Sequence, residues 1–207
     1  IDLLYNNLQY VLCNLKEKGT QKAYDRVSAV SNNDEKKRIQ LKLQNCNIDN
    51  HNATAVSAMF YYLTQIQELN LAGNQIGDPG ATAIAKVLSR LTQLRELSFR
   101  DNQIDDSSAI ALANAIANLT QLQDLYLGKN RIGDSGAIAI ANSIINLTQL
   151  QNLYIGSNQI RDSGAIAIAH VASKLTRLQG LDISENNISE PVRQHIRQAN
   201  KKHTFYI

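Results

Sequence analysis

The chain has 207 residues, of which 43% are hydrophobic and 19% charged, so it can bury a core and is too apolar for wholesale disorder. Its formal net charge is +3, but residues 63–190 hold nine Lys/Arg against twelve Asp/Glu, and this slightly acidic region argues against nucleic acid as a partner. No apolar run approaches the roughly 20 residues of a membrane helix, which argues against membrane insertion.

The first 34 residues predict helices. An apolar stripe with helical spacing comes first, formed by Leu3, Leu4, Leu8, Val11, Leu12 and Leu15. A second helix is expected over residues 21–30. Because the chain begins at Ile1 and not at methionine, we expect that it has been processed or trimmed.

A 28-residue repeat follows. The segment Leu-Thr-x-Ile/Leu recurs with its first leucine at Leu63, Leu91, Leu119, Leu147 and Leu175. Each copy continues with a segment of the form L-x-L-x-x-N-x-I, in which another apolar residue can take the place of the second leucine, as Phe99 does in the second copy. One step upstream, a degenerate sixth copy is expected, in which Cys46 occupies the position of the asparagine; it contains Leu41, Leu43, Cys46 and Ile48.

Each copy predicts one short strand and one helix. The L-x-L segment alternates with period two, as a strand does. Asp134 opens the helical segment of its copy as the expected helix-capping residue. One apolar stripe follows it, at Ala137, Ile140, Ala141 and Ile144. After Pro191 a basic helix is expected to end near Lys202, and residues 203–207 are expected to add a last edge strand.

These units resemble leucine-rich repeats of the ribonuclease-inhibitor-like subclass, which is also the repeat type of NOD-like receptors and Ran GTPase-activating proteins. The resemblance covers residues 36–207 and implies an α/β leucine-rich-repeat solenoid, a horseshoe with a concave parallel sheet and convex helices. The spacings of strands and helices lead to the same shape. Strands stack about 4.8 Å apart whereas helices need roughly 8–10 Å, so the stack must curve with its sheet on the concave side. We therefore expect an N-terminal helical cap over residues 1–34. About six repeats over residues 35–207 would form the leucine-rich-repeat domain, with the last strand as its C-terminal cap.

No motif predicts catalysis or a cofactor. Gly133-Asp134-Ser135-Gly136 matches the string around the nucleophile of trypsin-like proteases, but the same slot recurs in other copies and marks a helix start. Cys13, Cys46 and the four scattered histidines lack metal-ligand spacing, and there is no phosphate-binding glycine loop. The recurring asparagine is expected to bond main-chain groups where each strand turns away. We therefore expect no catalytic residue, no metal and no cofactor.

Differences between copies at exposed strand positions predict a partner-binding surface. Tyr126 and Tyr154 fall on adjacent strands, and exposed tyrosines are favoured at binding surfaces. Tyrosine is also a good strand former, so a purely structural pair is the alternative. Carboxylates flank the pair on one side, and Arg100 and Lys129 flank it on the other. The predicted partner-binding residues are Glu96, Arg100, Asp124, Tyr126, Lys129 and Tyr154.

These features together favour a non-enzymatic, monomeric protein–protein interaction module that binds a partner protein on its concave face. The near-identical, Asn/Ile-rich repeats are similar to those of bacterial effectors. That similarity implies secretion by a bacterium into the host cytosol and a host protein as partner. One alternative is a GTPase regulator of the Ran GTPase-activating type, although no motif carries over residue by residue. The other is the substrate-binding half of a larger enzyme, such as a ubiquitin ligase, whose activity would lie outside this chain.

Overall fold

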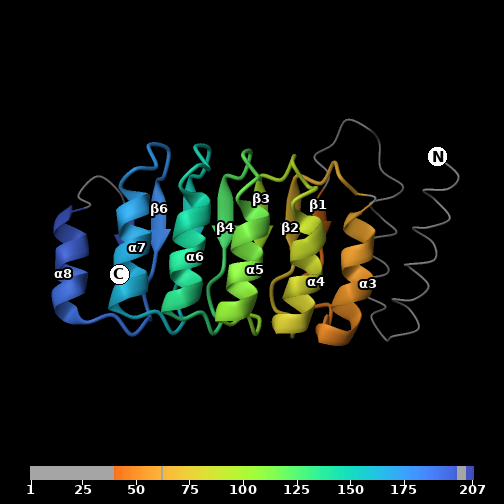
Figure 1. The fold of residues 1–207 in the computed structure, drawn as a ribbon, viewed down its shortest axis with the longest axis horizontal. Helices are drawn as coiled ribbons and strands as arrows, with labels where there is room; N and C mark the ends of the chain where they lie inside the picture. The colour runs from red at the N-terminus through yellow and green to blue at the C-terminus, as the bar shows by residue number, and fades with distance from the viewer. Residues whose placement is uncertain (1–39, 62, 200–203) are drawn as a thin grey trace, which may run out of the picture.

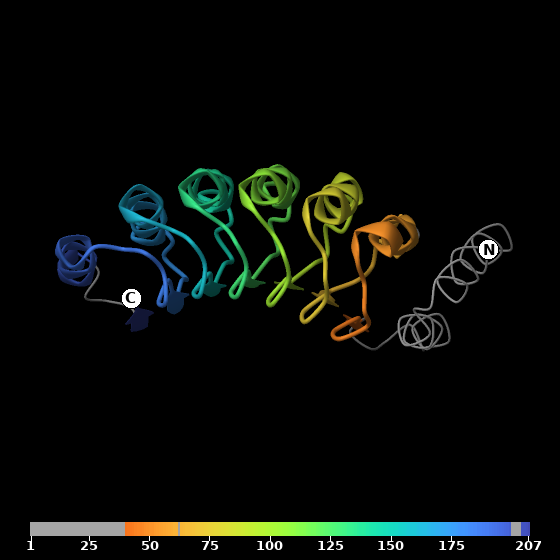
Figure 2. The same ribbon diagram turned by 90° about the horizontal axis from the view of Figure 1, so that it is seen from below.

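The computed structural model describes residues 40–61, 63–199 and 204–207. The expected N-terminal helical cap, residues 1–34, lies outside these ranges. Within them strands and helices alternate along the chain, and the strands form one parallel sheet in sequential order (Figure 1). Seen along the strands, the sheet lines the inner side of a shallow arc and the helices line its outer side (Figure 2). The concave sheet and convex helices expected from the sequence are therefore confirmed.

Each strand of the sheet spans three residues. The strands are β1 (Gln40–Lys42), β2 (Glu68–Asn70), β3 (Glu96–Ser98), β4 (Asp124–Tyr126), β5 (Asn152–Tyr154), β6 (Gly180–Asp182) and β7 (Thr204–Tyr206). The helices are α3 (Asn50–Phe60), α4 (Asp78–Leu88), α5 (Asp106–Ile116), α6 (Asp134–Ile144), α7 (Asp162–Ala172) and α8 (Glu190–Ala199). The degenerate first copy and the last edge strand are thus both formed, and the basic helix α8 ends at Ala199.

The core lies between the sheet and the helices. Equivalent residues of successive strands pair in one register, so that Leu97 lies opposite Leu125 and Leu125 opposite Leu153. These central leucines are at most 1% exposed and point toward the helices. The predicted helical stripe is confirmed, since its four residues are all buried: Ala137, Ile140, Ala141 and Ile144. Because alternate strand residues point to opposite faces, the residues on either side of each leucine face the concave side.

A ladder of asparagines closes the turns that follow strands β2 to β6. The Oδ1 atom of Asn158 accepts from the amide of Ile132 at 3.0 Å, and its Nδ2 donates to the carbonyl oxygens of Leu127 and Ile155, both at 3.0 Å. Equivalent bonds are made by Asn74, Asn102, Asn130 and Asn186. The structural role predicted for this asparagine is confirmed: it satisfies buried main-chain groups of two repeats at once.

The expectation that Asp134 caps its own helix is wrong. The N-cap of α6 is Gly133, and no side chain caps this helix from within its own repeat. Asp134 instead accepts hydrogen bonds from backbone amides of the next repeat, those of Arg161 and Gly164. A Cβ at Gly164 would lie 2.7 Å from Asp134 Oδ1, so the glycine leaves room for this bond. The carboxylate crosses to its neighbour because the helix starts of adjacent repeats lie side by side.

The third residue after each of the strands β1 to β6 turns the chain with a positive φ. In register these residues are Asn45, Gly73, Asp101, Lys129, Ser157 and Glu185, with φ between 53° and 64°. Asn and Gly adopt this left-handed conformation readily, whereas a lysine or glutamate does so at a cost. The turn is therefore imposed by the stacking of the repeats and not by local residue preference.

Candidate functional site on the concave face

Two columns of side chains dominate the open face of the sheet. The first column precedes the buried leucine of each strand and contains Glu68, Glu96, Asp124, Asn152 and Gly180. The second column follows that leucine and contains Asn70, Ser98, Tyr126, Tyr154, Asp182 and Tyr206. Parallel pairing holds neighbours in a column about 4.8 Å apart at the backbone. Any change of residue type along a column therefore creates a local chemical patch.

Tyr126 and Tyr154 stack in the middle of the second column. They lie opposite each other in β4 and β5, with ring centroids 5.1 Å apart and ring planes inclined by only 6°. Both side chains are half-buried. Gly128 and Gly156 follow them in the chain, and a Cβ at Gly128 would lie 3.1 Å from the Gly156 carbonyl oxygen. The two glycines are buried and let neighbouring repeats approach closely beside the rings.

Carboxylates lie next to this aromatic pair. Glu96 and Asp124 face each other in β3 and β4, and Asp124 Oδ1 accepts from Asn152 Nδ2 at 2.6 Å. Burial raises the pKa of Tyr126 to about 12, and the negative charges of Asp124 and Glu96 add to the effect. The Tyr126 phenol therefore stays protonated at neutral pH and keeps its hydrogen-bond donor. The Tyr154 hydroxyl donates to Asn152 Oδ1 at 3.5 Å.

The structure brings five of the six predicted site residues onto the sheet face. Glu96, Asp124 and the two tyrosines lie in the first and second columns, and Arg100 is exposed just beyond β3. Lys129 lies instead in the left-handed turn after β4, where it is exposed at the rim of the face. Arg100 and Lys129 thus both lie at the edge of the face formed by the C-terminal ends of the strands.

Sequence reasoning missed a hollow at the C-terminal end of the face. It has a volume of about 500 Å³ and is lined by Tyr154, Asp182, Ser184, Arg197, Tyr206 and Ile207. Tyr206 lies opposite Asp182 in the neighbouring strand but follows it by 24 residues and not 28. Because the last repeat is shorter, extending the period does not place Tyr206 in the column.

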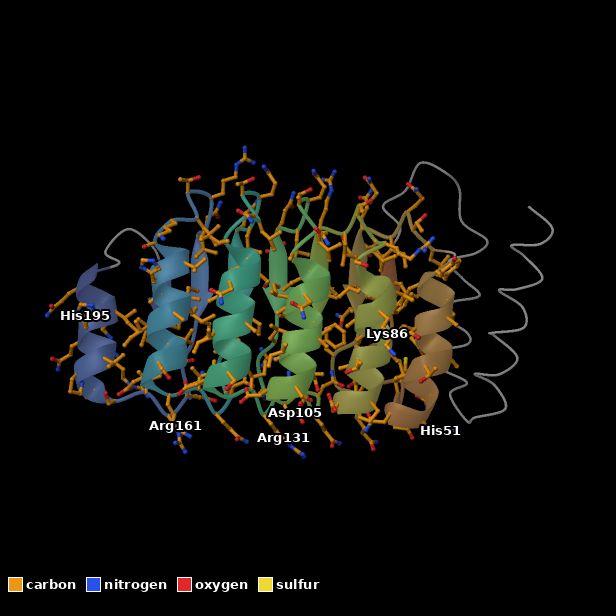
Figure 3. The ribbon with its side chains drawn as sticks, viewed as in Figure 1. His51, Lys86, Asp105, Arg131, Arg161 and His195 are labelled. Atoms are coloured by element: carbon orange, nitrogen blue, oxygen red, sulfur yellow. The ribbon has the colours of Figure 1, made fainter. Side chains whose placement is uncertain are left out.

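A second hollow lies on the edge where the helices begin. Its volume is about 520 Å³, and Arg131, Arg161 and Asp105 are among its lining residues. Figure 3 shows both arginines pointing outward from this edge. The arginines replace Gln and Gly of other repeats, a departure that could have drawn attention to them in the sequence. The neighbouring carboxylates Asp106 and Asp134 already accept backbone amides of the next repeat, so they serve the fold.

Within the described ranges, no group of three or more His, Cys, Asp or Glu side chains is placed to hold a metal ion. Nor does any helix of residues 40–61, 63–199 and 204–207 combine the length and apolarity needed to cross a bilayer. Cys46 is buried in the position that asparagine takes in later repeats, as expected, and its thiol donates to the carbonyl oxygen of Gln44.

A family model described as a leucine-rich repeat matches the chain over residues 62–85, 91–113, 118–141 and 146–169. None of the curated proteins compared with the chain matches it. One similar solved structure is the leucine-rich-repeat ectodomain of the receptor kinase SOBIR1 from Arabidopsis thaliana, at 20% identity and a TM-score of 0.41. That match covers 66% of this chain and 64% of the receptor chain.

An internalin, InlF, from Listeria monocytogenes is 22% identical with a TM-score of 0.40, over 74% of this chain and 49% of the internalin. A pollen receptor kinase 3 is 20% identical with a TM-score of 0.41, over 61% of this chain and 53% of that one. The chain thus spans less than two thirds of the length of each of these three. With matched repeats, parallel strands on the inner side and helices on the outer side, the chain is an α/β leucine-rich-repeat solenoid.

Proposed function

We propose that this chain is a non-enzymatic protein-binding module that holds a partner protein on its concave face. The observation that carries the proposal is the Tyr126–Tyr154 stack, a half-buried aromatic surface at the centre of an open sheet. Tyrosine contributes contact area and a hydroxyl at a low cost in side-chain entropy, which suits a binding surface.

The alternative, that the tyrosines serve only to pair the strands, explains less. The same column holds Asn70, Ser98 and Asp182 in other strands, and these pair in the same register. The core beneath is closed by buried leucines, such as Leu125 and Leu153, which every described strand but the last carries. Strand pairing and core closure therefore do not require aromatic residues on the open face, whereas a binding surface benefits from them.

The mixed charges around the stack favour a protein partner. Glu96 and Asp124 lie on one side and Arg100 on the other, so that the surface offers both signs of charge around an apolar centre. Such a face matches the apolar core and polar rim of protein interfaces. Leucine-rich-repeat folds are typical of protein–protein interaction modules, and this fold supports the same role here.

The biological setting is part of the proposal. The 28-residue spacing supports the ribonuclease-inhibitor-like subclass, and the near-identical Asn/Ile-rich copies support a bacterial effector that acts on a protein of a host cell. The chain would act as a monomer, because a partner on the concave face needs no second copy.

Affinity capture tests the proposal. The parent chain is compared with a Tyr126→Ala/Tyr154→Ala/Arg100→Ala variant, with candidate partners from eukaryotic cell lysate. The matched control is Ile138→Ala/Ile166→Ala, which removes exposed apolar area from α6 and α7 on the convex side. A protein retained by the parent and the control, but lost by the concave-face variant, supports the proposal. Equal retention by the concave-face variant, with intact circular dichroism, would overturn it.

A further inference from the structure

We infer that the hollow between Tyr154 and Tyr206 binds a lysine or arginine side chain of the partner protein. This inference rests on the proposed function, because it names the chemistry that one part of the concave face recognises. It concerns the end of the second column, from Tyr154 of the stack to Tyr206 two strands further along the sheet.

The placement of three residues carries the inference. Tyr154, Asp182 and Tyr206 occupy equivalent positions in β5, β6 and β7, so one carboxylate lies between two aromatic side chains. All three line the same hollow of about 500 Å³, which is roomy enough for one long side chain. Tyr206 is 58% exposed, so its ring is available to a ligand.

A carboxylate flanked by aromatic rings is a site for a cation. The faces of aromatic rings carry partial negative charge and attract ammonium and guanidinium groups. The carboxylate adds a full negative charge and charge-assisted hydrogen bonds. Asp182 is held in place by its own turn, since its Oδ1 accepts from the Ser184 amide at 2.9 Å and from the Ser184 hydroxyl at 2.6 Å. Both bonds engage Oδ1, so that Oδ2 can accept from a ligand without breaking them.

Arg197 also lines the hollow, but its guanidinium already has partners. Its guanidinium lies 3.4 Å from Glu190 and donates to the carbonyl oxygen of Ile207 at 3.1 Å. The arginine is thereby held along α8 and the chain end, where it forms one wall. Its guanidinium is engaged with Glu190 and Ile207 and, among the described residues, makes no ion pair with the Asp182 carboxylate.

The charge of the whole face favours the same ligand. Its strand positions carry four carboxylates, Glu68, Glu96, Asp124 and Asp182, against the cation Lys42, and Arg100 follows just beyond β3. A basic segment of the partner would be attracted along the acidic first column before one of its cations enters the hollow. Such complementarity raises association rates and selects against acidic partners.

The test uses synthetic peptides of defined charge on the whole chain. A short peptide of alternating serine and lysine is titrated against the ¹⁵N-labelled protein, and a matched serine–glutamine peptide serves as the neutral control. We expect the lysine peptide to shift the amide signals of Tyr154, Asp182 and Ser184, with weaker binding at higher salt. Equal binding of the glutamine peptide, or shifts confined to another face, would overturn the inference.

Two variants with the same change in net charge test whether the lysine of the peptide binds at Asp182. Asp182→Asn keeps an oxygen for the Ser184 bonds and should weaken the lysine peptide about tenfold. Asp101→Asn removes one carboxylate from a left-handed turn that asparagine tolerates, and should leave the affinity unchanged. Equal effects of the two variants would show that only net charge matters and would overturn the pocket.

The outcome also separates this inference from the proposed function. If the lysine peptide fails to bind while the Tyr126→Ala/Tyr154→Ala/Arg100→Ala variant still loses its captured protein, the cation pocket is wrong and the binding face stands. If the lysine peptide binds in the hollow while a Tyr126→Ala/Arg100→Ala variant, which leaves Tyr154 in place, retains every captured protein, the cation pocket stands and the central stack is not the binding surface.

Discussion

The Oδ1 atom of Asp134, the first residue of α6, accepts hydrogen bonds from the amides of Arg161 at 2.8 Å and Gly164 at 3.0 Å. Arg161 is the N-cap of α7, and Gly164 lies in its first turn. Asp106 makes the same bonds to the start of α6, at 2.7 and 2.9 Å. Each of these helices is therefore capped by the repeat before it. In a solenoid such bonds add to the coupling between neighbouring repeats that makes unfolding cooperative.

Removal of this inter-repeat cap should destabilise the chain. Asp134→Ala is expected to lower the free energy of unfolding by about 1–2 kcal/mol, the range found for helix caps. Asp134→Asn should lower it less, because the amide oxygen can accept the same two bonds. Urea unfolding followed by circular dichroism measures both. Ser135→Ala, at the exposed next residue, is the control, and a loss as large as that of Asp134→Ala would contradict the capping role.

The capping carboxylates should make stability depend on acid pH. The hydrogen bond from the Ser108 amide lowers the pKa of Asp105, and this effect outweighs burial, which raises the pKa. Burial opposes the shift at Asp134, but hydrogen bonds from Ser163, Arg161 and Gly164 outweigh it and lower that pKa too. A lowered folded-state pKa stabilises the fold above the unfolded pKa of about 4, and this contribution is lost as the pH falls through the lowered pKa.

Unfolding midpoints from pH 7 down to pH 2 should therefore decrease less in an Asp105→Asn/Asp134→Asn variant than in the parent. The double variant removes both titrating groups while it keeps an acceptor oxygen at each position. Parallel curves for the two proteins would show that these carboxylates do not carry the acid sensitivity.

Removal of one asparagine from the ladder should lower the free energy of unfolding. Asn158→Ala leaves one buried amide and two buried carbonyl groups without their side-chain partner, so we expect a loss of about 3 kcal/mol or more. Asn142→Ala, on the exposed side of α6, should change stability little and serves as the matched control. Chemical denaturation at neutral pH compares them. Similar midpoints for the two variants would contradict the ladder's role.

The phenol of Tyr126 should lose its proton at a higher pH than an ordinary tyrosine. Burial, followed by the charges of Asp124 and Glu96, raises its pKa from 10.0 to about 12. A raised folded-state pKa contributes stability that is complete below the unfolded value and is lost as the pH rises from 10 to 12. Spectrophotometric titration of tyrosinate, compared between the parent and Tyr126→Phe, isolates this group. Asp124→Asn should lower its pKa, and an unchanged titration in that variant would contradict the electrostatic contribution.

Replacement of Lys129 by glycine in its left-handed turn should stabilise the fold. Its φ is 56°, a conformation that costs a residue with a Cβ roughly 1–2 kcal/mol. Lys129→Gly is therefore expected to raise the free energy of unfolding by about 1 kcal/mol, once the extra chain entropy of glycine is subtracted. Lys86→Gly, an exposed helical position in α4, should lower it by about the same amount. Thermal unfolding of the two variants should shift in opposite directions.

Much of the site could be predicted because the repeat is regular. A constant 28-residue period predicts that equivalent residues pair across strands, and Tyr126 and Tyr154 do so. The same argument placed Glu96 beside Asp124. It failed at Lys129, where the chain leaves the strand and the alternation of side chains ends. Period-two reasoning is valid only while the backbone stays extended.

The strands, the buried leucines and the asparagine ladder could be predicted from residue spacing alone, because near-identical units stack on one another. Each repeat must bury the same face against the next, so its pattern repeats with the structure. Two features needed the three-dimensional arrangement. Asp134 caps the following helix because the lateral offset between helices puts that helix's amides within its reach, and no spacing within one repeat encodes that offset. Tyr206 completes the hollow beside Asp182 because a shorter last unit still docks in register on β6, where the sheet edge offers unpaired backbone groups to any strand.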